Sequence, residues 1–510
     1  MRKSLQLFLH KPTIILFVVV FASLFVLGST AGLAATKTWV PTTGGAWTTA
    51  ANWNPAGAPA AGDDVVIPAD QSANITAVPA ITLNSLTVNG NCLWAGAASG
   101  NTITITTSMS IAAGKTLTLG ATGGRLVFTL NGTATVNGNF AFDAGRTVRN
   151  FTVNNGATLI VAPTGRVYDP TLRAGSVFIL NSGATLRIGN TGGISTAVTS
   201  NPNVAVNFGG SYTYGTGANY VYNGTAAQVT GNGLTQHTPG NVTISNSAGV
   251  TLSAATTVGG DLTISSGATL ATGNFQVTLN GNFINNGGTF TAGSSPIVIA
   301  GTLATQNIAG FTTTGLVSMT KTAGTATFTG NVNGSGITIN GVGGTLNLGT
   351  GLTHTFTGTW TRTNGTLNGG SSTMIIGGNV SGTGGTFTAN TGTVQYNAAG
   401  AQTVAGVTYN NLTLSGGGAK TTTGGNSTVN GILTLTSGVL TTGADTLSLS
   451  STGSVSQTTG WVAGNFRKYI ATGATSKILL MVPYSGQTSY MIDSGFSRGI
   501  EWLLPANCRP

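Results

Sequence analysis

The sequence predicts an all-β protein, a right-handed parallel β-helix whose strands stack in successive coils. Similar segments begin at Gly209, Gly287 and Gly384. The second interval between these starts exceeds the first by close to one solenoid coil, which takes about 20 residues. A whole coil can be lost without disturbing the register of the remaining stack. The spacing therefore predicts four coils in the shorter interval and five in the longer one.

Alternation of apolar and polar residues supports the same fold class. Apolar-Thr-apolar triplets recur between Gly, Asn and Ser turns, as in Leu262–Ile264 and Leu433–Leu435. Such triplets place two side chains inward and one outward, and alternation of this kind is the strand signal. Low-complexity disorder is the alternative for a chain so rich in glycine, but 40% of the residues are apolar. A flat β-sandwich would show the same alternation without explaining the loss of a whole coil.

Residues 1–35 have the pattern of a secretory signal. Arg2, Lys3 and Lys11 flank an apolar core over 14–27, and small residues follow at positions 32–35, where cleavage is expected. The core is short for a membrane span, so an uncleaved anchor is the less favoured interpretation. We therefore expect a secreted or cell-surface protein with no transmembrane segment after cleavage.

Three tryptophans mark the next segment, residues 36–75. Trp39, Trp47 and Trp53 lie close together in the sequence and precede a strand predicted over Val65–Ile67. An open solenoid end exposes strand edges, so a cap is expected there. A tryptophan-lined sugar site is the alternative. The predicted organisation is a signal peptide (1–35), a cap with the first strand (36–75), β-helix repeats (76–465) and an atypical or truncated terminal segment (466–510).

Composition restricts the class of function. Charged residues make up only 5% of the chain, so the surface must be dominated by hydroxyls and amides, as suits an extracellular wall. Two cysteines, Cys92 and Cys508, lie far apart, and Cys92 is expected to be a small core residue. Neither cysteine and histidine spacing nor calcium-binding repeats indicate a metal, so no metal and no cofactor are predicted.

Several of these segments resemble known repeats. The segments after Gly287 and Gly384, with Gln402–Gly406 and Tyr409–Leu414, resemble the β-strand repeats of large bacterial surface proteins, especially of Bacteroidetes type. The opening Trp39–Pro68 is similar to the start of many secreted β-helix proteins, and Val462–Tyr469 resembles the closing motif of such repeat regions. The resemblance implies a parallel β-helix with a surface or adhesin-like role. It says almost nothing about chemistry.

Regularly spaced arginines are the candidate contact site. Arg125, Arg146, Arg166 and Arg187 follow one another at nearly equal intervals. With coils of about 20 residues they are expected at one corner of successive coils, where they would touch an anion such as an acidic glycan. The alternative is a set of solvated turn residues, because the charges are sparse. Interleaved aromatic residues are lacking, so no specific nucleic acid is expected as a partner.

An enzyme is the main alternative. Parallel β-helices can host polysaccharide lyases and hydrolases that use paired carboxylates. Asp143 and Asp169 are the only acids among the arginine-bearing coils. Their separation in the sequence is greater than one coil of about 20 residues, so a longer loop would be needed to bring them together. Solvated turn aspartates are therefore expected, and no catalytic residue is assigned.

Two further patterns suggest ligands. The tyrosines at 212, 214, 220 and 222 look like a sugar-stacking platform, but they align with Phe, Ala, Ile and Val in the other copies, which predicts core positions. Threonine pairs at 102/104, 116/118, 133/135 and 325/327 resemble the arrays of ice-binding solenoids. The first three pairs recur at unequal intervals that are shorter than a coil, which argues against such an array.

The sequence thus predicts a non-catalytic, adhesin-like surface or matrix protein. Its contacts would be shallow and multivalent, with extracellular polysaccharide or cell-surface glycans as partners. A polysaccharide lyase or hydrolase, or an acidic-glycan-binding module, is the alternative. The oligomeric state and the mode of surface attachment are not defined by the sequence.

Overall fold

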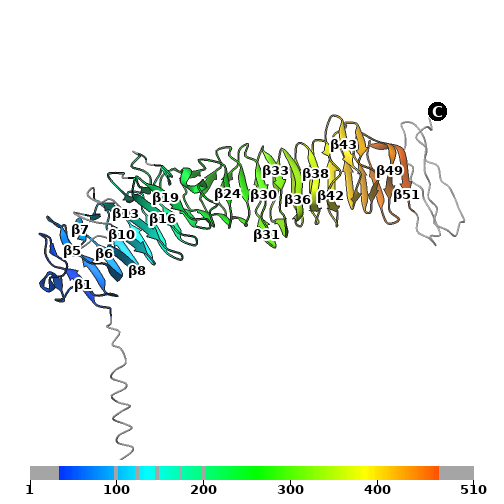
Figure 1. Cartoon of the computed structure of the whole chain (residues 1–510). Coiled ribbons are helices and arrows are strands. Elements are labelled where there is room, and N and C mark those ends of the chain that lie inside the picture. Colours follow the sequence, from blue (N-terminus) through cyan, green and yellow to red (C-terminus); the bar gives the residue numbers. More distant parts are fainter. Residues whose placement is uncertain are drawn as a thin grey trace, which may run out of the picture.

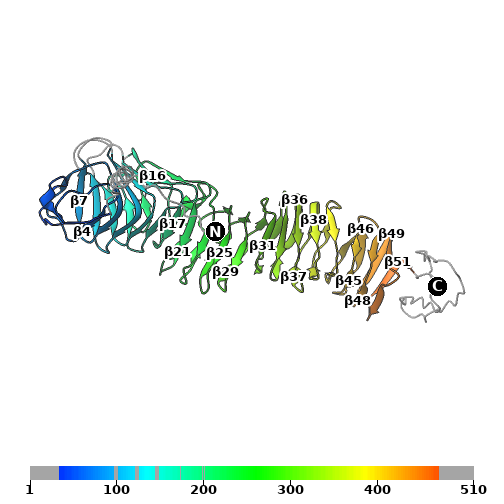
Figure 2. The same cartoon turned by 90° about the horizontal axis from the view of Figure 1, so that it is seen from below.

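The chain forms an elongated β-solenoid of about 18 turns (Figures 1 and 2). This computed structural model describes residues 34–96, 101–120, 126–143, 149–172, 174–197, 199 and 201–469. The signal peptide up to residue 33, Arg125, Arg146 and the segment after Tyr469, with Cys508, lie outside the described residues. Stacked strands lie about 4.8 Å apart, so 18 turns make a rod roughly 85 Å long. The all-β solenoid predicted from the sequence is confirmed.

Most coils contribute strands to three faces, and strands of one face pair in parallel from coil to coil. Face 1 contains β10 (Leu126–Leu130), β13 (Arg149–Val153), β16 (Ser176–Leu180), β19 (Ser211–Tyr214), β24 (Thr256–Val258), β27 (Val277–Leu279), β30 (Ile297–Ile299), β33 (Leu316–Met319), β40 (Val380–Ser381), β43 (Gln402–Ala405) and β46 (Lys420–Thr423). The 3-10 helix η2 (Asn232–Thr235) lies between β19 and β24.

Face 2 follows face 1 in each coil. It contains β1 (Thr36–Trp39), β4 (Asp64–Ile67), β11 (Thr133–Val136), β14 (Thr158–Val161), β17 (Thr185–Ile188), β20 (Asn219–Tyr222), β22 (Val242–Ile244), β25 (Leu262–Ile264), β28 (Phe283–Asn285), β31 (Thr305–Ile308), β34 (Thr325–Phe328), β41 (Thr386–Thr388), β44 (Thr408–Tyr409) and β47 (Ser427–Val429). Longer strands run through the corner and serve both faces: β6 (Ile81–Val88), β8 (Asn101–Ile111), β36 (Gly336–Asn347), β38 (Trp360–Asn368), β49 (Val439–Leu449) and β51 (Trp461–Lys468).

Face 3 completes the coil. It contains β2 (Gly45–Ala46), β5 (Ile75–Val78), β7 (Cys92–Gly96), β9 (Thr116–Gly120), β12 (Asn139–Phe142), β15 (Arg166–Tyr168), β18 (Val206–Asn207), β21 (Gln228–Val229), β23 (Val250–Thr251), β26 (Thr269–Ala271), β29 (Thr289–Thr291), β32 (Phe311–Thr312), β35 (Val332–Gly334), β37 (Thr353–Phe356), β39 (Thr373–Ile376), β42 (Thr393–Tyr396), β45 (Asn411–Leu414), β48 (Ile432–Leu435) and β50 (Ser454–Gln457).

The length of a coil changes along the rod. In the C-terminal half Val242 pairs with Leu262 and Thr325 with Thr345, which fits the predicted coil of about 20 residues. The coils nearer the N-terminus are longer, because successive partners along face 2 are Thr133, Thr158, Thr185 and Asn219. The prediction of one coil length for the whole chain is therefore wrong, since turns of the first half carry insertions.

The three sequence copies lie on three different faces. Tyr212 belongs to face 1, Phe290 to face 3 and Phe387 to face 2. From Tyr212 to Phe290 the chain completes three coils and two further faces. From Phe290 to Phe387 it completes four coils and two further faces. The predicted whole numbers, four and five, are therefore wrong, although the difference of one coil is confirmed. One motif fits any face because all three faces are similar strand-and-turn units.

The interior is a continuous apolar core. Phe128, Phe151 and Phe178 occupy one position in successive coils, and their rings stack at centroid distances of 5.0 and 6.0 Å. Tyr212 takes the same position in the next coil. All four tyrosines of the suspected sugar platform, residues 212, 214, 220 and 222, are buried. Their prediction as core residues is confirmed, as is that of Cys92, which is buried with a free thiol.

The tryptophan-rich segment closes the first end of the core. Trp39, Trp47 and Trp53 are buried, and Trp53 packs edge-to-face against the other two at 4.9 and 4.7 Å. β1 pairs in parallel with β4 on one edge and antiparallel with the short β3 (Trp53–Asn54) on the other. The 3-10 helix η1 (Ala50–Asn52) leads into β3. β3 thus covers part of the outer edge of the first strand, which is what a cap must do.

Candidate interaction surface

The two described arginines of the predicted ladder lie on different faces. Arg166 is in β15 on face 3 and pairs with Asn139, whereas Arg187 is in β17 on face 2 between Ile160 and Val221. The predicted stacking of these two side chains is therefore wrong. Its cause is the coil length: the local coils are longer than the interval between the arginines, so one such interval ends on a different face. Whether Arg166 or Arg187 contacts an anion remains a prediction.

Asp143 and Asp169 do follow equivalent strands. Asn139 pairs with Arg166, so β12 and β15 end one coil apart just before the two aspartates. The coil between these two strands is longer than about 20 residues, which is the condition for the two aspartates to lie at equivalent positions. Asp169, however, is fully buried and forms an ion pair with Arg149, which is also fully buried. The expectation of a solvated turn residue is wrong for Asp169, which instead neutralises a cation inside the scaffold.

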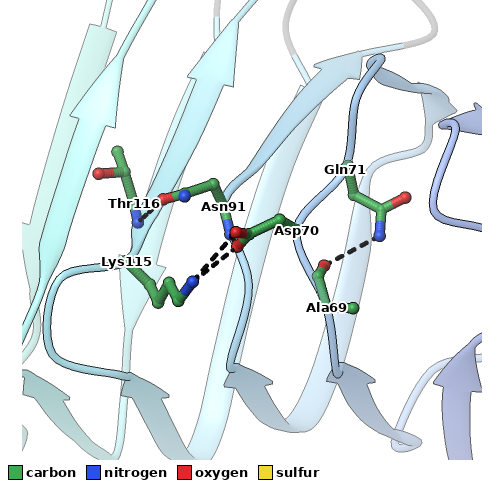
Figure 3. A network of polar contacts seen from close by, with 6 residues as sticks. All are labelled: Ala69, Asp70, Gln71, Asn91, Lys115 and Thr116. Atoms are coloured by element: carbon green, nitrogen blue, oxygen red, sulfur yellow. Dashed lines mark hydrogen bonds and ion pairs between the residues drawn. The ribbon is translucent and has the colours of Figure 1, made fainter.

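Side chains of Asn and Asp brace the corners between coils. In Figure 3, the Asp70 carboxylate accepts the Asn91 N–H at 2.7 Å, and the Asn91 side-chain oxygen accepts the Thr116 N–H at 2.8 Å. Lys115 reaches the same carboxylate at 3.0 Å. The Asn91 N–H and Lys115 hold the pKa of Asp70 below its usual value. Asp70 therefore acts as a charged brace.

A longer ladder of the same type runs beside face 2. Asn219 accepts the backbone N–H of Asn241, Asn241 that of Asp261, Asp261 that of Asn282, and Asn282 that of Asn307, at 2.8–2.9 Å. Asp261 thus occupies an asparagine position, and its carboxylate oxygen accepts the backbone N–H that an asparagine side-chain oxygen accepts elsewhere in the ladder. Among the described residues no group of three His, Cys, Asp or Glu could hold a metal ion.

Buried glutamines form a second brace between coils. In the sequence they are visible only as a glutamine that recurs in the three similar segments. Gln228, Gln306 and Gln402 lie near the ends of the three similar segments, and each is almost fully buried. Each side-chain amide donates to two backbone carbonyls of the preceding coil, at distances of 2.5–2.9 Å. The recurrence of glutamine in an otherwise variable segment was the signal for this role.

Three cationic or basic groups of the C-terminal half are also internal. Lys321 donates to the Gln306 side chain at 3.1 Å, and Lys420 donates to two backbone carbonyls; burial lowers the pKa of both lysines. His354 accepts the Val332 N–H at Nδ1 and contacts the Leu348 carbonyl through Nε2. This pattern fits a neutral ring, and burial lowers the pKa of His354.

The outward positions carry hydroxyls and amides in register. On face 2, Thr305, Thr325, Thr345, Thr366 and Thr386 are direct strand partners in five successive coils. A second column two positions further along each strand contains Asn307, Thr327, Asn347, Asn368 and Thr388. We call these ten residues the threonine face. The pairs at 102/104, 116/118 and 133/135 fall on faces 1, 3 and 2, which explains their irregular spacing.

No family model, no curated protein and no solved structure matches this chain. The β-solenoid is therefore established by the structure alone, and the resemblance to Bacteroidetes-type surface repeats stays a prediction. Within the part of the chain that the structure describes, no helix has the length and apolarity to cross a membrane.

Proposed function

We propose that the chain is a non-catalytic, adhesin-like protein, exported to the cell surface or its surroundings, which attaches to an extended surface through many weak contacts. The observation that carries this proposal is the repetition of identical outward positions in register, above all the threonine face. Equal contacts repeated along a rigid rod add up by avidity, so no single deep site is required.

The use of the carboxylates supports a binding role over a catalytic one. Asp63 accepts the N–H groups of Ala35 and Ala60, and Asp64 accepts side-chain bonds from Asn84 and Ser85. Asp70, Asp169 and Asp261 are engaged as described above. A glycoside-cleaving site needs two carboxylates that reach the same substrate bond. These five carboxylates instead hold backbone and side chains of the scaffold.

The distribution of charge favours a neutral ligand for the C-terminal half. Between Val242 and Leu440 the chain has four charged residues, Asp261, Lys321, Arg362 and Lys420. Both lysines are buried and Asp261 belongs to the asparagine ladder. Binding through this half should therefore depend little on salt, whereas an acidic polymer held by arginines would be released by salt.

The test is binding and turnover of the purified chain on a panel of neutral and acidic polysaccharides and of ice, at low and high salt. Salt-insensitive retention on a surface without release of product is expected. Release of oligosaccharides would contradict the non-catalytic role and direct attention to the corner of Asp143 and Asp169. Binding only to acidic polymers, lost at high salt, would move the contact to Arg166 and Arg187.

A further inference from the structure

The threonine face is more regular than the neighbouring columns on faces 1 and 3. Its five threonines follow one another at almost constant intervals, and each is the direct partner of the next. The equivalent column on face 1, from Thr257 to Ser381, includes Val298. A column on face 3 includes Ile375 and Gln395. Among these three columns, only the one on face 2 has the same hydroxyl-bearing residue in five successive coils.

The hydroxyls of this column are available to a ligand. None of the five threonine hydroxyls forms a hydrogen bond with another described residue. Thr325, Thr345 and Thr366 are half-buried, whereas Thr305 and Thr386 at the two ends are exposed. The intervening residues Ala326, Leu346 and Leu367 are fixed in the core, with at most 1% exposed surface. Threonine is also stiff at χ1, so the outward groups lose little freedom when a ligand binds.

The chemistry of the face restricts the ligand. All ten residues are threonine or asparagine, so the face carries no charge and no aromatic ring. It offers nothing to neutralise an acidic polymer and no ring on which a sugar could stack. What it offers is a grid of hydroxyls, amides and methyl groups, which suits a neutral, periodic network of hydrogen-bonding groups.

The spacing of the grid matches that of tetrahedral water. Neighbouring strands lie about 4.8 Å apart. Hydroxyl–water hydrogen bonds are about 2.8 Å long, so next-nearest oxygens of a tetrahedral network lie about 4.5 Å apart. The mismatch of about 0.3 Å per coil accumulates to roughly 1.2 Å over the four intervals of the column. This is well under half of one spacing, so all five hydroxyls can stay in register with an ordered water lattice.

We propose that the threonine face binds ice. This inference rests on the proposed function, since it names the extended surface to which the rod attaches. The threonine hydroxyls take lattice positions of the outermost water layer, and the methyl groups fill the spaces between them. Attachment requires several hydroxyls acting together, because one hydroxyl alone gains almost nothing over its bond to liquid water.

The test compares two equivalent substitutions on one strand. Thr345 and Thr338 are half-buried outward residues of β36, on face 2 and face 1 of the same coil. The full chain and the variants Thr345→Tyr and Thr338→Tyr are each equilibrated with slowly growing ice, and the fraction of protein taken into the ice is measured. Circular dichroism melting checks that both variants fold equally well.

We expect the unmodified chain to enter the ice, Thr345→Tyr to lose most of this uptake, and Thr338→Tyr to retain it. Absence of uptake by the unmodified chain, or equal loss in both variants, would overturn the proposal. Retention on insoluble cellulose that Thr345→Tyr alone abolishes, without uptake by ice, would assign the face to a neutral glycan and leave the proposed function intact. Retention on neither surface would contradict both proposals.

Discussion

The glutamine brace at Gln306 allows the sharpest prediction about the scaffold. Its side-chain amide donates to the carbonyls of Leu279 and Gly281 at 2.9 and 2.5 Å, and its oxygen accepts the ammonium of Lys321 at 3.1 Å. Gln306 and Lys321 are both completely buried. The substitution Gln306→Leu keeps the volume of the side chain but removes all three hydrogen bonds.

The expected loss of stability follows from the polar groups that lose Gln306 as their hydrogen-bond partner. Each buried polar group without a partner costs about 1–3 kcal/mol, and more when it is charged. Lys321 keeps its bond to the Leu303 carbonyl at 3.2 Å, and such losses are not additive within one network. We therefore expect Gln306→Leu to lower the free energy of unfolding by about 3–5 kcal/mol. Coils contact only their neighbours, so the loss should be concentrated in β28, β31 and β34.

Hydrogen exchange of the backbone amides, resolved by strand, measures this effect directly. The matched control is Gln395→Leu, since Gln395 faces outward on face 3 and donates only to the Ser415 hydroxyl at 3.0 Å. That change should stay within about 0.5 kcal/mol. Equal exchange rates in the two variants, or a loss spread evenly along the rod, would refute the assignment of Gln306 as a brace between coils.

Three further predictions concern buried ionisable groups. Asp169→Asn leaves Arg149 buried without its carboxylate and should cost about 3–5 kcal/mol in urea unfolding, whereas replacing both residues with leucine should cost less. His354 is held neutral with a lowered pKa, so its contribution to stability is complete above about pH 6.5 and is lost as the pH falls towards the folded-state pKa. His354→Gln should flatten this pH dependence of the urea midpoint. Burial raises the pKa of Cys92 to about 12, so a thiol reagent at pH 8 should label it only after unfolding, as peptide mapping would show.

The fold class was predictable because its signals are local. Alternating apolar residues and glycine-rich turns indicate strands regardless of their partners. The interchange of Tyr212 with Phe290 and Phe387 likewise identified a core position without any knowledge of which face held it. Inward-facing positions are constrained only by the apolar interior, which is the same on all three sides of the coil.

The assignment of residues to faces was not predictable from spacing. A separation in sequence gives a separation in space only when the coil length is constant. Here the coil from Thr185 to Asn219 is much longer than the coil from Val242 to Leu262. This is why Arg166 and Arg187 lie on different faces. The column through Thr325 and Thr345 does recur at the predicted coil length, but the uneven spacing of the threonine pairs in the first half argued against such an array. The same motif also occurs on all three faces, so the intervals between its copies are not whole numbers of coils.

Deletion of residues 326–345 tests the central claim, that repeated outward contacts add up to attachment. The deletion joins Thr325 to Leu346, and Ala326 and Leu346 are register partners, so one whole coil is removed without disturbing the stack. The shortened chain should fold and melt like the parent but bind its surface, ice in our proposal, measurably more weakly, because one of five contacts is gone. Unchanged binding by a folded deletion variant would place the contact elsewhere and contradict the account.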